Sequence, residues 1–364
     1  MAVLAWCGFV VGVVVLGVTA SSVMKTLLVP RANQSIVTST VARVNFAAFR
    51  LVTNHVDDYT RRDRVWSVGA PTFLAGLLAA WLVSLLLGFA LVLWPFTDDS
   101  FATALRVAGS SLFTLGFAAP TAPSTTAIAF LAAASGLVVV ALQIAYLPAL
   151  YAAFNRRETL VTMLDAIAGT PPWGPELLAR QSIIGNLAYL PRLYERWMEW
   201  AADISESHAT YRTLVYFRSP GPARSWLIAL VAVLDAAALH VALCPTTAPP
   251  EARLLLRMGY ITIRQLARDL GIDVPDDPRP DDPIALGRPD FDQALERLRS
   301  VGWLPELSAD EAWPHFGGWR VNYETAAYAI ACHLDLPPAP WSGPRRPFTH
   351  AAAAANRPPD RTPT

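Results

Sequence analysis

Apolar residues are concentrated in three uncharged stretches in the first half of the chain. Residues 2–23, 65–96 and 107–155 contain no Asp, Glu, Lys or Arg. At a rise of about 1.5 Å per residue, the first stretch is roughly 33 Å long, enough to cross a hydrocarbon core of about 30 Å. The third is too long for one crossing and too short for two crossings with a polar loop between them. The pattern therefore predicts three transmembrane helices, with a re-entrant segment before the last of them.

The first stretch has a competing interpretation. Val18-Thr19-Ala20 resembles the small-residue cleavage site of a secretory signal peptide, but no Lys or Arg precedes the apolar residues. We therefore favour a transmembrane helix for residues 2–23.

Basic residues beside the apolar stretches predict the topology. They outnumber acidic residues between positions 24 and 64, and Arg156-Arg157 follows the third stretch. The positive-inside rule places both segments in the cytoplasm. Arginine replaces lysine almost throughout, and Ala and Pro are abundant, which is typical of a high-GC bacterial genome. We thus expect a multi-pass protein of a bacterial inner membrane, with its N-terminus outside and its C-terminal domain in the cytoplasm.

Two further segments, one amphipathic and one apolar, are interpreted as helices that do not cross the membrane. Apolar residues from Val37 to Leu51 recur at helical spacing, which predicts a helix lying either on the membrane surface or against another helix. Residues 226–243 are apolar but contain Asp235 and His240, and a crossing there would export the arginines that follow. We interpret them as the core of a cytoplasmic helical domain.

Further helices of that domain follow from the spacing of apolar residues. One buried face runs from Leu193 to Tyr211, and a Pro- and Asp-rich loop is expected at 273–283. The other helices are predicted near residues 175–190, 222–243, 250–270, 288–301 and 321–334.

The composition excludes some function classes. The chain is 53% hydrophobic and 16% charged, with a mean hydropathy of +0.34 and a formal net charge of zero. Neutrality and interspersed arginines give no basis for a nucleic-acid partner. Three cysteines are too few for a disulfide framework. A lipid bilayer is the partner that the apolar stretches indicate.

The segment between the second and third crossings carries the candidate chemistry. Residues 101–118 read FATALRVAGSSLFTLGFA, a short amphipathic helix followed by Thr-Leu-Gly-Phe-Ala. Non-helical backbone at membrane depth persists only when it is buried in protein or lines a water-filled path. Carbonyls of Thr114, Leu115, Gly116 and Phe117, with the Thr114 hydroxyl, can replace the hydration shell of a cation. The preceding helix directs its negative C-terminal end toward that cation.

These residues resemble the filter of the tetrameric potassium-channel superfamily, whose pattern is Thr-Val/Leu-Gly-Tyr/Phe-Gly-Asp. The whole chain is similar to a group of little-characterised bacterial proteins of that family, with one pore loop and a helical cytoplasmic domain. Further matching stretches lie at residues 149–158, 206–208, 216–219, 225–227 and 318–324. The resemblance implies passive conduction of K⁺, or another monovalent cation, through a filter at Thr114 to Ala118. Because one chain has one pore segment and a carbonyl cage needs several, the predicted unit is a homotetramer.

The predicted fold is therefore all-α, in four parts. An N-terminal transmembrane helix and a cytoplasmic amphipathic linker occupy residues 1–64, and a pore module of outer helix, pore helix, filter and inner helix occupies 65–157. A cytoplasmic α-helical domain follows at 158–341, and a disordered tail at 342–364. The domain is expected to regulate the pore through an unknown ligand or protein.

The filter departs from the family pattern at its outer end. Ala118 stands where the second filter glycine is usual, and Ala119-Pro120 where an acid is usual. If this position needs a positive φ, alanine costs about 1–2 kcal/mol in each subunit. The departure leaves ion selectivity open and favours a second hypothesis, a non-conducting membrane-anchored interaction or sensory protein on a degenerate channel scaffold.

Three residues of the inner helix are weaker candidates. Gly136 is placed for a gating hinge, or allows close helix packing. Pro148 is also a candidate gating hinge, because it removes a helical hydrogen bond near the cytoplasmic mouth, or it simply ends or kinks the span. Gln143 is a candidate cavity lining, or bonds to a neighbouring helix.

Other constellations do not support an enzyme or a cofactor. His240, Cys244, Cys332 and His333 allow a zinc site to be drawn, but the spacing matches no usual pair of ligands. His208, with Ser207 or Ser225 and Asp235, lacks a nucleophile elbow, so we interpret it as an interhelical hydrogen-bonding residue. We expect no catalytic residue, no structural metal and no cofactor.

Overall fold

The structure is a computed structural model of the chain and describes residues 2–29, 35–97, 100–120 and 122–343. Within these ranges it consists of helices, turns and loops and contains no strand, so the predicted all-α class is confirmed. Four apolar helical stretches are long enough to cross a membrane: Val3–Leu27, Tyr59–Phe96, Pro123–Ala168 and Trp226–Leu243.

The chain divides into two compact units. Unit 1 contains residues 1–55 and 68–152, and unit 2 contains residues 56–67 and 153–364. Unit 1 comprises α1 (Ala2–Leu27), α2 (Ile36–Thr53), α4 (Gly69–Leu93), the short η1 (Trp94–Phe96), α5 (Phe101–Leu112) and most of the apolar part of α6 (Pro123–Ala168). The short segment 56–67 contains α3 (Tyr59–Ser67).

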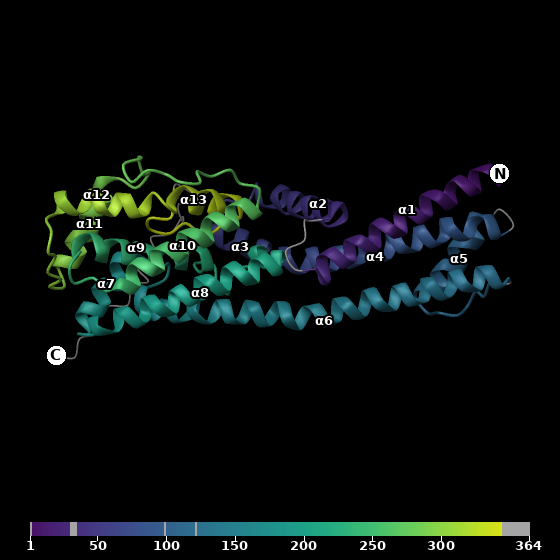
Figure 1. Cartoon of the computed structure of the whole chain (residues 1–364), viewed down its shortest axis with the longest axis horizontal. Coiled ribbons are helices and arrows are strands. Elements are labelled where there is room, and N and C mark those ends of the chain that lie inside the picture. Colours follow the sequence, from purple (N-terminus) through teal and green to yellow (C-terminus); the bar gives the residue numbers. More distant parts are fainter. Residues whose placement is uncertain (1, 30–34, 98–99, 121, 344–364) are drawn as a thin grey trace. The chain divides into compact units, whose positions relative to one another are not determined.

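Helices α1 and α4 pack closely because glycines remove side chains at their contact. They lie side by side in Figure 1. A Cβ atom at Gly12 would lie 2.8 Å from the carbonyl oxygen of Gly88, and one at Gly88 would lie 2.7 Å from Leu16. The Trp81 indole donates a hydrogen bond to Ser22 Oγ at 2.9 Å. Small residues and one buried hydrogen bond are the usual means by which transmembrane helices associate.

Helix α2 matches the predicted amphipathic helix, and one of its faces contacts α4. Phe46 stacks on Phe73 with ring centroids 6.2 Å apart, and the Asn45 amide donates to the carbonyl of Gly69 at 3.0 Å. The opposite face keeps Val44 and Leu51 about two-thirds exposed. The helix is therefore a tertiary-contact helix that also presents an apolar face.

The uncharged stretch at residues 65–96 covers the end of one helix, a second helix and a short turn. Helix α3 ends at Ser67, α4 begins at Gly69, and a 3₁₀ turn replaces the α-helix from Trp94. Tyr59 of α3 is buried within unit 2, where its hydroxyl lies 3.0 Å from the Arg218 guanidinium, so tertiary contacts separate this helix from α4.

Unit 2 is built around α9 (Trp226–Leu243), whose 18 residues are all buried. Helices α7 (Gly174–Ile183), α10 (Pro250–Asp269) and α12 (Ala309–Arg320) cover it. Helix α8 (Leu190–Thr210) packs mainly on α10, and α11 (Arg288–Arg299) and α13 (Glu324–His333) complete the unit, with 3₁₀ turns at Leu187–Tyr189 and Arg212–Tyr216. The interpretation of residues 226–243 as the core of a helical domain is confirmed. The tail expected from residue 342 lies outside the described residues from 344 onward.

Charged residues inside unit 2 are paired. Asp235 of α9 accepts hydrogen bonds from the Arg320 guanidinium and from the Tyr323 hydroxyl, the latter at 2.7 Å. Arg157 donates to the carbonyls of Leu214 and Phe217, both at 2.7 Å. A buried charge is tolerated only when it is paired and fully hydrogen-bonded, which explains how α9 keeps an aspartate in an apolar core.

Candidate functional site

Helix α5 is too short to cross a membrane. Its 12 residues measure roughly 18 Å, about 60% of a hydrocarbon core. Ser100 caps its N-terminus, since its hydroxyl accepts a hydrogen bond from the Thr103 N–H at 3.4 Å. The helix therefore has a defined start, and it ends where the candidate filter begins.

The end of α5 is a Schellman turn with Thr114 in the left-handed region. Thr114 has φ of +54°, its N–H donates to the Ser111 carbonyl at 3.0 Å, and the Leu115 N–H donates to the Ser110 carbonyl at 2.8 Å. A β-branched residue with positive φ is a genuine outlier and costs about 1–2 kcal/mol. Gly116 also has positive φ, +74°, at a position where glycine carries no such penalty.

The carbonyl groups of the candidate filter are unoccupied by protein donors. In the described part of the chain, no hydrogen bond is donated to the carbonyl oxygens of Thr114, Leu115, Gly116 or Phe117. Leu115 is 63% exposed and Phe117 60% exposed. In an exposed loop such carbonyls are ordinarily hydrated, so these four are open to water or to a cation.

Ala118 avoids the strain that a filter glycine position would impose. It is not among the residues with positive φ, and its N–H donates to the Ser110 hydroxyl at 3.0 Å. The expected cost of alanine at this position therefore does not arise in this conformation. Ser110 is fully buried and holds both ends of the loop, through its carbonyl and its hydroxyl.

Gly136 lies against the end of α5. A Cβ atom at Gly136 would collide with the carbonyl oxygen of Leu112, so the backbones of α5 and α6 approach too closely for any other residue. Pro148 does not end the helix, because α6 continues to Ala168. This contact favours the interpretation of Gly136 as a close-packing residue, and its role as a gating hinge stays a prediction.

Gln143 is buried within unit 1. It is 5% exposed, and its Oε1 atom has no hydrogen-bond partner among the residues that the structure describes. An unpaired buried amide oxygen is unfavourable by about 1–3 kcal/mol, which marks this position as one where a partner or a water molecule is expected. Its role as a cavity lining stays a prediction.

The residues considered for a hydrolase are engaged in structural contacts in unit 2. The His208 Nε2 atom lies 3.3 Å from the Arg157 guanidinium, and its Nδ1 atom lies 3.0 Å from the Ile204 carbonyl. Ser225 caps α9, and Asp235 binds Arg320. The interpretation of His208 as a hydrogen-bonding residue between helices is confirmed.

The zinc constellation is not assembled. His240 and Cys244 line one cavity, but no cluster of three or more His, Cys, Asp or Glu side chains able to hold a metal occurs within residues 2–29, 35–97, 100–120 and 122–343.

Comparison with known proteins identifies no relative. No protein-family model, curated protein or solved structure matches the chain. The resemblance to potassium channels therefore rests on the residues of the chain itself.

Sequence reasoning missed Ser110 and the cavity of unit 2. Ser110 looks like an ordinary small residue of an amphipathic helix, and its two contacts with the loop depend on how the loop turns back. The cavity is lined from several separate segments, including α7, the end of α9 and the loop after α11. Neither feature leaves a periodic signal along the chain.

Proposed function

We propose that the chain forms a homotetrameric cation channel of the inner membrane, with residues 114–118 along the conduction path. The observation that carries this proposal is the run of four carbonyls that have no donor among the described residues, in a loop that follows a helix too short to cross the membrane. Such carbonyls replace the hydration shell of a monovalent cation, and potassium is the ion that the filter-like sequence favours. The C-terminal end of α5 adds a negative partial charge beside the loop.

A single chain exposes the surfaces that a symmetric assembly would cover. Leu115 and Phe117 project from the loop, and Phe130, Leu137 and Ile144 of α6 are 71%, 66% and 63% exposed. One loop supplies one quarter of a carbonyl cage, so conduction by this route needs other copies of the chain. Lipid covers whatever part of the α6 face the copies leave open. Unit 2 is then the regulatory domain in the cytoplasm.

A second function is supported by the same turn. The Schellman hydrogen bonds account for the positive φ of Thr114 without any ion, and Ala118 replaces the second filter glycine. These observations favour a membrane-anchored interaction or sensory protein that has kept a channel scaffold but does not conduct.

Cation flux from liposomes under a potassium gradient distinguishes the two functions. We expect flux with the wild type and none with Gly116→Ala, because alanine at φ of +74° is strained by about 1–2 kcal/mol in each of four subunits. Gly17→Ala is the matched control. A Cβ atom at this position of α1 would meet no atom within 4 Å, so the flux through this variant is expected to equal that through the wild type.

The remaining outcomes favour the second function. Flux only in Ala118→Gly would mean a scaffold closed by its own filter. Absence of flux from folded, reconstituted wild type and from all three variants, or undiminished flux in Gly116→Ala, would contradict conduction through this loop.

A further inference from the structure

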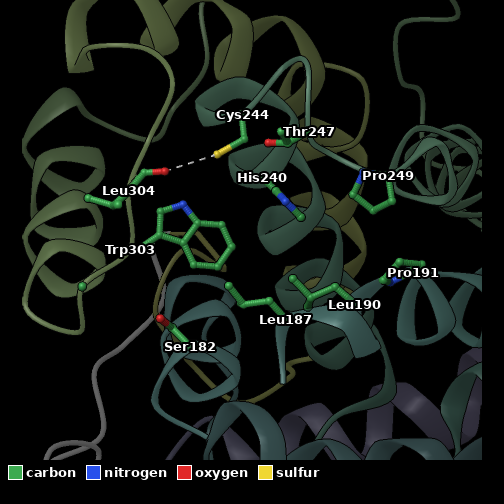
Figure 2. A pocket seen from close by; sticks show the side chains of 11 residues that line it. Ser182, Leu187, Leu190, Pro191, His240, Cys244, Thr247, Pro249, Trp303 and Leu304 are labelled. Carbon is green, nitrogen blue, oxygen red and sulfur yellow. Dashed lines mark hydrogen bonds between the residues drawn. The ribbon is translucent and has the colours of Figure 1, made fainter. Parts of the chain in front are cut away.

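Unit 2 contains a cavity of about 400 Å³ (Figure 2). Its walls are mainly apolar, and include Leu187, Leu190, Pro191, Pro249, Trp303 and Leu304. Glu306 holds the loop that follows α9 on one side of the cavity. Its carboxylate accepts hydrogen bonds from the N–H groups of Thr246 and Thr247, both at 2.9 Å. The size and the apolar lining are those of a small-molecule site.

Most polar groups of the cavity already donate to the protein. The Ser182 hydroxyl donates to the Val301 carbonyl at 3.2 Å, the Thr247 hydroxyl donates to Glu306, and the Cys244 thiol points at the Leu304 carbonyl, 3.9 Å away. These groups have no proton left to offer to a ligand.

His240 and Trp303 are the exceptions. The Trp303 Nε1 atom is buried and has no hydrogen-bond partner among the described residues, so its N–H is a second open donor at the cavity wall. His240 is 8% exposed, its Nδ1 atom lies 3.1 Å from the Tyr194 hydroxyl oxygen, and its Nε2 atom makes no hydrogen bond within the described residues. Figure 2 shows its ring among the side chains that surround the cavity. A nitrogen without a protein partner, on a nearly buried side chain at a cavity wall, is an open hydrogen-bonding position.

The contact with Tyr194 assigns the proton of His240. Tyr194 is fully buried and its hydroxyl has no other acceptor in the described structure, so it donates to Nδ1 rather than leave its proton unpaired. The other nitrogen, Nε2, then carries the hydrogen and is a donor. Burial lowers the pKa of His240 to about 4, which keeps the ring neutral at pH 7.

We propose that this cavity binds a neutral, largely apolar molecule with a carbonyl oxygen that accepts a hydrogen bond from His240 Nε2. An aromatic ring suits the wall, since Trp303 meets His240 edge-on with centroids 5.3 Å apart and presents its own apolar surface. No Lys or Arg is among the described residues that line the cavity, so a carboxylate or phosphate would lack a counter-charge. The proposal is independent of ion conduction.

Ligand-observed ¹⁹F NMR on the full chain in lipid nanodiscs tests the proposal. The probes are 4-fluoroacetophenone and 1-ethyl-4-fluorobenzene, which differ by replacement of the carbonyl with CH₂, and empty nanodiscs supply the baseline. We expect the ketone to bind about fivefold tighter, as one net hydrogen bond provides. The Tyr194→Phe/His240→Phe double variant removes both polar partners together and leaves neither unpaired. It should bind the two probes equally.

A second pair of variants tests the location. Leu187 lines the cavity and is 43% exposed, whereas Ile184 is 64% exposed and is not part of the lining. Leu187→Trp should fill the mouth of the cavity and abolish binding of both probes, and Ile184→Trp should bind them like the wild type. Binding unchanged by Leu187→Trp, equal binding of the two probes by the wild type, or a ketone preference kept by the double variant would overturn the proposal.

Discussion

Two apolar helices of this chain meet opposite surroundings. Helix α6 exposes large side chains along its apolar part, with Phe130 71% exposed, whereas every residue of α9 is buried inside unit 2. Both stretches are long and apolar enough to cross a membrane. The difference lies in a few polar residues: α9 contains Asp235, which needs the buried Arg320, and the apolar part of α6 contains no charge. Apolar content alone therefore does not distinguish the two helices, whereas the paired charge inside α9 does.

The largest expected effect is the loss of the ion pair that permits α9 to be a core helix. Arg320→Met leaves the Asp235 carboxylate buried without its cation, which should destabilise the protein by about 3–5 kcal/mol. The measurement is thermal unfolding of the full chain, followed by tryptophan fluorescence. Arg279→Met removes an exposed ion pair and should change stability by less than about 1 kcal/mol. Equal effects of the two substitutions would mean that the pair does not stabilise α9.

The second-largest expected effect is a loss of stability when the packing of α6 on α5 is disturbed. Gly136→Ala places a methyl group against the Leu112 carbonyl, and relief requires the helices to separate, at about 1–3 kcal/mol. The same unfolding assay should show a lower midpoint, with Gly17→Ala unchanged or slightly higher. An unaltered midpoint for Gly136→Ala would show that α5 does not lie this close to α6.

A smaller effect distinguishes the role of Thr114 in the turn after α5 from its proposed role as an ion ligand. Thr114→Gly relieves a positive φ in a β-branched residue and should raise stability by about 1 kcal/mol. It also removes the hydroxyl proposed to contact the ion, so flux should fall while the unfolding midpoint rises. If flux and stability rise together, the hydroxyl is not an ion ligand.

The smallest effect concerns the loop that follows α9. Hydrogen bonds from the Thr247 hydroxyl and from the N–H groups of Thr246 and Thr247 lower the pKa of Glu306 to about 2, from an ordinary value of 4.5. A depressed folded-state pKa contributes stability above about pH 4.5, and this contribution disappears as the pH falls toward 2. The wild type should therefore unfold at a higher temperature than Glu306→Gln at pH 7, and the gap should narrow below pH 4.5. A gap that is constant with pH would exclude the carboxylate charge as its cause.

Helical periodicity and uncharged length predicted much of the fold. They indicated the all-helical class, the amphipathic helix at 36–53, the short helix before Thr114 and the buried position of α9, because each depends on local sequence and polarity. The separation of α3 from α4 was missed, since it depends on contacts of α3 with distant residues such as Arg218.

Helix α12 was also missed, for a different reason. Pro314, Gly317 and Gly318 give it poor helix propensity, while packing of the buried Phe316 and a capping box between Ser308 and Glu311 stabilise it. The Ser-x-x-Glu spacing was the available signal. In the candidate site, the filter-like residues were visible in the sequence, but the hydroxyl of Ser110 and the free carbonyls depend on the path of the loop.

Ion binding by a tetrameric filter is tested most directly by a cryo-electron-microscopy structure of the full chain in lipid nanodiscs with K⁺, compared with one in Tl⁺. For a homotetrameric channel we expect four copies around one axis, the Thr114 to Phe117 carbonyls directed at that axis, and ion density between them that strengthens with Tl⁺. A monomer or dimer, or carbonyls directed away from a shared axis, would contradict it.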